Sequence, residues 1–134
     1  MDFTHLNWLA VVAAALSAFV LGGIWYSRPL FGNAWMTDSN LTEDQIKSGN
    51  KGKIFGFTFI FSLVMAANLA LFLSGSQTDV HRGIAIGFHT GLFAFCAIAI
   101  HSLFELRSRR HILINGLYSV VSLTLMGAII GCWR

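Results

Sequence analysis

Four apolar stretches, each long enough to cross a lipid bilayer as one helix, constrain this chain more than any other feature. They span about residues 6–26, 54–74, 83–104 and 112–133. A helix needs about 20 mostly apolar residues to cross the hydrocarbon core. Only 11% of the residues are charged, whereas soluble domains carry about 25%. We therefore expect one all-α domain over residues 1–134, a polytopic membrane protein whose four transmembrane helices form an antiparallel bundle.

The connections between these stretches differ in length. Residues 75–82 and 105–111 form short links, which favour antiparallel packing of the second, third and fourth helices as neighbours. In the long link, Pro29 predicts the end of the first helix. Residues 30–36 then predict a short amphipathic segment at the membrane interface. The sequence Thr42-Glu43-Asp44-Gln45 has the spacing of a capping box and predicts one or two further helical turns.

The positive charges are distributed unevenly between the two sides of the predicted bundle. Seven of the nine Lys and Arg residues lie in the first and third connections: Arg28, Lys47, Lys51, Lys53, Arg107, Arg109 and Arg110. The positive-inside rule places these two connections in the cytoplasm, so both termini should lie outside. The formal net charge of +3 suggests anionic lipid headgroups as partners, because the basic residues flank apolar segments. We expect no nucleic-acid binding.

Small residues line one face of the third stretch. At about 100° per residue they fall in a stripe about 80° wide. The stripe contains Gly83, Gly87, Thr90, Gly91, Ala94, Ala97, His101 and Glu105. Gly127 and Gly131 form a GxxxG pair in the last stretch. Small residues let helix backbones approach closely in lipid, so we expect self-association into a homo-oligomer, with the five glycines as packing residues.

Polar residues gather at the predicted cytoplasmic end. Folding the last two helices about residue 108 sets His101 level with Asn115 and Glu105 level with His111. The candidate cluster comprises Tyr26, Arg28, His101, Glu105, His111, Asn115 and Tyr118. One interpretation is a polar vestibule in which Glu105 or His101 binds a proton or a cationic solute. The other is structural, with Glu105 paired to Arg28 or Arg107 and Asn115 joining two helices.

His89 lies about 160° from the small-residue stripe, on the face of Phe93, Cys96 and Ile100. It should therefore face lipid, a neighbouring subunit, or Asn68 on the preceding helix. His89 and His101 are about 18 Å apart along one helix, so they cannot ligate one haem. The set His101, Glu105 and His111 matches no known zinc signature. No catalytic constellation stands out, and we expect no enzyme activity, no metal and no cofactor.

The motifs LGGIWYSRPLFGNAWM, LTEDQIK, SLFE and LINGLYSVVSLTLMGAIIG resemble a family of small bacterial integral-membrane proteins, domain of unknown function 1761. The resemblance covers nearly the whole chain and implies a four-helix protein of the bacterial inner (cytoplasmic) membrane with no assigned activity. The matching residues are Trp25, Tyr26, Ser27, Pro29, Phe31, Gly32, Trp35, Glu105 and Asn115. Arg28 and His101 depart from the pattern, so the resemblance gives neither a family-wide role.

These observations lead to two functional hypotheses. The first is a non-enzymatic, self-associating membrane component. The second is a small-solute or ion transporter or channel, formed between subunits, in which Glu105 and His101 are the proton-coupling groups.

Overall fold

The computed structural model describes residues 2–133, and within them it is all-α. A short 3₁₀ turn, η1 (Phe3–His5), precedes six helices. The elements are α1 (Trp8–Trp25), α2 (Gly32–Asp38), α3 (Glu43–Ser48), α4 (Lys51–Phe72), α5 (Val80–Phe104) and α6 (Arg109–Cys132). α1, α4, α5 and α6 are each long and apolar enough to cross a membrane. The predicted fold class is therefore confirmed, including the short helical segments between the first two long helices.

Each long helix begins at a polar capping residue. The side chains of Asn7, Asn50, Asp79 and Ser108 accept a hydrogen bond from the backbone N–H three residues later. Such caps satisfy backbone donors that have no partner within the helix. They explain why α4, α5 and α6 begin three residues before their apolar stretches. The predicted capping box is also present, with Thr42 and Gln45 bonded reciprocally at the start of α3.

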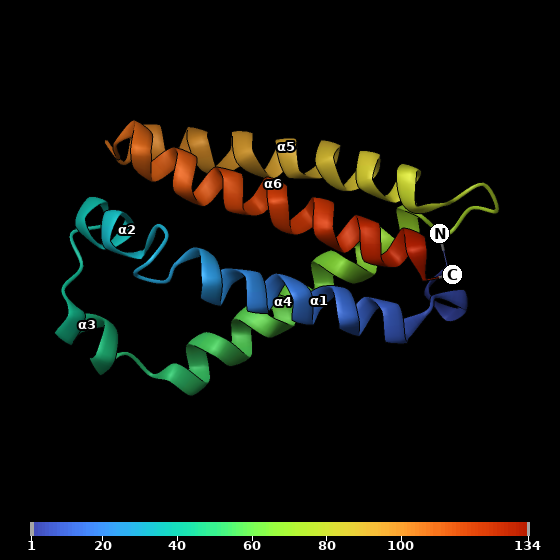
Figure 1. The fold of residues 1–134 in the computed structure, drawn as a ribbon, viewed down its shortest axis with the longest axis horizontal. Coiled ribbons are helices and arrows are strands. Elements are labelled where there is room, and N and C mark those ends of the chain that lie inside the picture. The colour runs from blue at the N-terminus through green and yellow to red at the C-terminus, as the bar shows by residue number, and fades with distance from the viewer. Residues whose placement is uncertain (1, 134) are drawn as a thin grey trace.

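α5 and α6 run side by side along their whole length (Figure 1). Their backbones touch at the glycines. A Cβ atom on Gly83 would lie 2.1 Å from the carbonyl oxygen of Gly127, and one on Gly131 would lie 2.5 Å from that of Asp79. Gly87 and Gly91 meet the backbones of Leu123 and Val120 in the same way. The predicted glycine packing therefore occurs within one chain. We expected this packing between chains. That expectation is corrected, because α6 of the same chain already covers the glycines of α5.

The contact line on α5 also departs from the predicted stripe beyond Gly91. Gly83, Gly87 and Gly91 repeat every four residues, and such a line turns about 40° around the helix at each step. It therefore continues through Phe95, whose ring lies against Gly116, and reaches the buried Ser102. His101 and Ala97, expected on the packed face, are exposed.

α4 packs against α1 and makes only slight contact with α5. Val11, Ala14 and Ala18 of α1 are buried with Ala66 and Ala70 of α4. Leu123, Met126 and Ile130 of α6 complete this core. The expectation that the second and third long helices are packed neighbours is therefore wrong. The small residues of α4 face α1, and those of α5 face α6. The short link between α4 and α5 therefore joins only their ends.

We predict that Gly87→Ala destabilises the protein, because the new methyl group would lie 2.3 Å from the backbone oxygen of Leu123. Overpacking of this kind costs about 1–3 kcal/mol of unfolding free energy. Gly23→Ala on α1 is the matched control, since nothing lies within 4 Å of its Cβ position. It should leave stability unchanged or raise it slightly. Denaturation of both variants in mild detergent checks this, and equal losses would contradict the α5–α6 contact.

Candidate functional site

The chain reverses direction directly after α1. The backbone N–H groups of Leu30 and Gly32 both donate to the carbonyl of Ser27, at 3.1 and 2.9 Å, and that of Phe31 donates to Trp25. A Cβ atom on Gly32 would lie 2.5 Å from the carbonyl oxygen of Tyr26, so the turn has no room for a side chain there. As a result, α2 folds back against α6.

Aromatic side chains fix this reversal. The indole N–H of Trp25 donates to the carbonyl of Ile114 on α6, at 2.9 Å. The rings of Trp25 and Phe31 are 4.7 Å apart, and those of Tyr26 and Trp35 are 5.3 Å apart. Tilted and edge-on pairs at such distances are favourable beyond their buried area. The end of α1, the turn and α2 therefore form one packed unit on α6.

Four residues of the predicted cluster lie together where the end of α1 and α2 pack on α6: Tyr26, His111, Asn115 and Tyr118. The Tyr26 hydroxyl donates to Oδ1 of Asn115 at 2.7 Å, and Nδ2 of Asn115 lies 3.1 Å from Nε2 of His111. Nδ1 of His111 lies 3.4 Å from Oγ of Ser39, just beyond α2. The Tyr118 hydroxyl donates to the carbonyl of Ala18 on α1, at 2.8 Å. We call Tyr26, His111, Asn115 and Ser39 the polar chain.

Hydrogen-bond directions define the state of the polar chain. Oδ1 of Asn115 accepts from Tyr26, so Nδ2 of the same amide is a donor toward His111. Nε2 of His111 faces this amide nitrogen as the acceptor. The other ring nitrogen, Nδ1, faces Oγ of Ser39. Each member thus has a partner, as polar groups removed from water require.

The other three predicted residues lie apart from the polar chain. Arg28 forms an exposed ion pair with Glu43 of α3. His101 is exposed on α5. Glu105 is exposed, with Oε2 3.7 Å from Nε of Arg107, one of the two partners that the structural interpretation named. Among the described residues, His101 forms no hydrogen bond with Asn115, and Glu105 forms none with His111. The α5–α6 contact line passes through Ser102 instead.

Sequence reasoning missed the contact that holds the end of α2. Asp38 accepts two hydrogen bonds from Arg110, each 2.8 Å long. The Asp38 side chain is only 10% exposed, whereas that of Arg110 is 58% exposed. The partners are 72 residues apart, and the only hint was the basic run in the α5–α6 link. The Arg110 guanidinium holds the pKa of Asp38 below its ordinary value of 3.8.

Asn68 and His89, expected as one possible pair, do not bond to each other. Asn68 donates to the carbonyl of Val64 within α4, at 2.7 Å. His89 is exposed on α5, and among residues 2–133 it has no hydrogen-bond partner.

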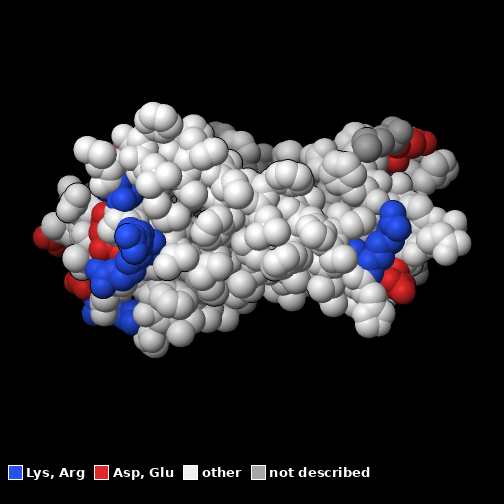
Figure 2. All heavy atoms as spheres, turned by 90° about the horizontal axis from the view of Figure 1, so that it is seen from above, with Lys and Arg blue, Asp and Glu red and all other residues white. Residues whose placement is uncertain are grey.

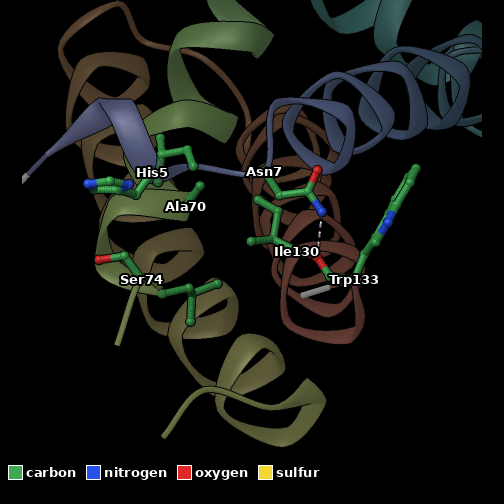
Figure 3. Close-up of a pocket in the computed structure, with 8 residues that line it drawn as sticks. His5, Asn7, Ala70, Ser74, Ile130 and Trp133 are labelled. Atoms are coloured by element: carbon green, nitrogen blue, oxygen red, sulfur yellow. Dashed lines mark hydrogen bonds between the residues drawn. The ribbon is translucent and has the colours of Figure 1, made fainter. Parts of the chain in front are cut away.

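A pocket of about 180 Å³ opens at the opposite end of the molecule. Figure 3 shows His5 and Ser74 on one side of it and Asn7 with Trp133 on the other. Nδ2 of Asn7 donates to the carbonyl of Trp133, at 3.0 Å, and so ties the start of α1 to the end of α6. Asn7 thus serves the junction of the two helix ends, whereas the Ser74 hydroxyl donates to the carbonyl of Leu71.

We predict that Asp38→Asn loosens α2, because the substitution keeps the shape but removes the charge that Arg110 holds. A carboxyl group whose pKa is lowered on folding stabilises the folded state at pH values above its ordinary pKa. This stabilisation is lost as the pH falls through the pKa of the folded state. Amide hydrogen exchange in α2, corrected for intrinsic rates, should therefore be faster in the variant at pH 5 and pH 7. The difference should shrink only below pH 3.8. Equal exchange in both proteins at pH 7 would contradict this role.

Comparison with known proteins identifies the family of the chain. Residues 9–131 match the family described as "Protein of unknown function (DUF1761)". No curated protein and no solved structure matches the chain. The match covers nearly the whole chain, including the turn after α1 and the polar residues of α6. The protein therefore belongs to the DUF1761 family.

Proposed function

We propose that the protein is a non-enzymatic membrane component that self-associates through the outer face of α5. The outer face is defined by His89, Phe93, Cys96 and Ile100, which project to one side of the helix at about 100° per residue. All four are exposed, Phe93 by 78% and Ile100 by 55%. This face points away from the glycine stripe, so it remains free when α5 is packed on α6.

His89 is the observation that carries the proposal. It lies about 4–5 Å along the axis from the centre of α5, at 1.5 Å per residue, and thus deep in the hydrocarbon region. An imidazole without a hydrogen-bond partner costs several kcal/mol in such a solvent. A second copy of the chain would bring polar groups of its own to this depth. Association through the outer face would therefore remove an unfavourable contact with lipid.

The non-enzymatic part of the proposal is supported by the sequence, which offers no nucleophile with a suitable base. The polar chain also fits a structural role, since its members serve one another as partners and hold α2 on α6. We accordingly treat it as the attachment of an interfacial segment.

We further propose that the protein lies in the inner (cytoplasmic) membrane of a bacterium, with α2 and α3 on the cytoplasmic side. Lys and Arg gather at the end that carries these helices, and the middle of the molecule is free of charge on the face in Figure 2. The start of α5, which carries Arg82, lies at the opposite end, where η1 and the end of α6 also lie (Figure 1). Arg134, also assigned to that end, is outside the described residues. The positive-inside rule supports this orientation.

Disulfide cross-linking at Cys96 tests self-association. In membranes treated with a mild oxidant, Cys132→Ser should form a disulfide-linked dimer and Cys96→Ser should not. In the Cys132→Ser background, His89→Leu should reduce the dimer several-fold, because it removes the polar group that needs a partner. His101→Leu, an exposed histidine about 120° around the same helix, is the matched control and should leave it unchanged. A monomer at all protein densities, or equal effects of the two leucine variants, would refute the proposal.

Cysteine labelling tests the orientation. In a Cys96→Ser, Cys132→Ser background, we place single cysteines at Ser48, the end of α3, and at Gln77, in the α4–α5 link. Both positions are exposed. A membrane-impermeant maleimide should label the Gln77 position in intact cells and the Ser48 position only after lysis. The reverse pattern would overturn the assignment of α2 and α3 to the cytoplasm.

A further inference from the structure

A pocket of about 300 Å³ lies where the end of α1, α2 and α3 meet. We call it the inner pocket. Its walls include apolar and aromatic side chains, among them Trp35, Met36 and Ile46, and the charged side chains of Arg28, Glu43 and Lys47. α1 ends at Trp25, three residues before Arg28. The inner pocket is therefore at the depth where hydrocarbon gives way to lipid headgroups.

The inner pocket holds more hydrogen-bond donors than acceptors. Glu43 is the one carboxylate among its lining residues, and Arg28 already binds it. Lys47 has no ion pair among residues 2–133. The indole N–H of Trp35 donates no hydrogen bond within the same described range, unlike that of Trp25. Arg28 carries five N–H donors, so its pairing with Glu43 leaves donors for another anion.

From these features we infer that the inner pocket binds the headgroup of an anionic phospholipid. Arg28 and Lys47 match the negative charge of the phosphate, and the indole N–H of Trp35 is a further donor. Met36 and Ile46 provide apolar surface for the glycerol backbone and the first carbons of an acyl chain. This is the chemistry of an amphiphile with an anionic head, and it distinguishes the pocket from a uniformly solvated basic surface.

The position of the inner pocket favours a membrane lipid over a soluble anion. It opens beside helices that are themselves long enough to span a bilayer, so a lipid reaches it by lateral diffusion. Anionic lipids of the cytoplasmic leaflet attract juxtamembrane Lys and Arg residues, each by about fivefold in affinity. The site depends on Arg28 and Lys47, which both line the inner pocket. It is independent of the self-association proposed above.

The test measures lipid retention by the full-length protein in native mass spectrometry. The probes are phosphatidylglycerol, phosphatidylcholine and inorganic phosphate. We expect phosphatidylglycerol to bind the wild-type protein at least about tenfold more tightly than phosphatidylcholine. The double variant Arg28→Gln, Lys47→Gln should bind phosphatidylglycerol about 25-fold more weakly. The matched control Lys51→Gln, Lys53→Gln loses the same charge at the start of α4 and should weaken binding clearly less, because neither lysine lines the inner pocket.

Three results would overturn the inference. These are equal binding of the two phospholipids, equal losses in the two double variants, and displacement of the lipid by inorganic phosphate at similar concentration. The last result would identify a soluble anion site. The variant Arg28→Lys, Lys47→Arg keeps both charges and should retain phosphatidylglycerol binding. Circular dichroism of every variant shows whether a loss of binding reflects a loss of fold.

Discussion

The close approach of α5 and α6 is the contact on which the rest of the structure depends. In lipid, apolar side chains gain little from leaving the solvent, so helices associate through tight packing and a few hydrogen bonds. At Gly83 and Gly127 there is no space for even a methyl group between the two backbones. α6 then presents its other faces to α1, α4 and α2. It is the common partner of the helix pair α1–α4 and of the short helix α2.

The features that were predictable from sequence are those that depend on neighbouring residues. Apolar runs located the four long helices, and the spacing of Thr42 and Gln45 located the capping box of α3. Pro29 and the residues after it indicated the turn and the short helix α2. Each of these depends on the properties of a few consecutive residues, such as hydropathy, a missing N–H or a side-chain oxygen at the right offset.

Choices between distant partners were less predictable. A short link suggested that α4 packs on α5, but Ala66 and Ala70 place it on α1. A helical wheel grouped His101 with the glycines of α5. The line of contact repeats every four residues and therefore turns around the helix, so His101 lies outside the α5–α6 contact. The pair Asp38 and Arg110 joins residues 72 apart, and many alternative cation partners were available. Of the candidate cluster, Tyr26, His111, Asn115 and Tyr118 were correctly placed near one another because their depth followed from helix ends.

The residues that carry the family resemblance perform one structural task in this chain, with one exception. Trp25, Tyr26, Gly32, Trp35 and Asn115 all take part in the reversal after α1 or in its attachment to α6. Glu105 is the exception, since it lies on the surface beside Arg107. The attachment combines the part-buried polar chain with the ion pair between Asp38 and Arg110. Salt screens the ion pair but hardly affects the polar chain, so α2 should remain docked when ionic strength rises. Tyr26 belongs both to the polar chain and to the wall of the inner pocket. Docking of α2 therefore shapes the inner pocket.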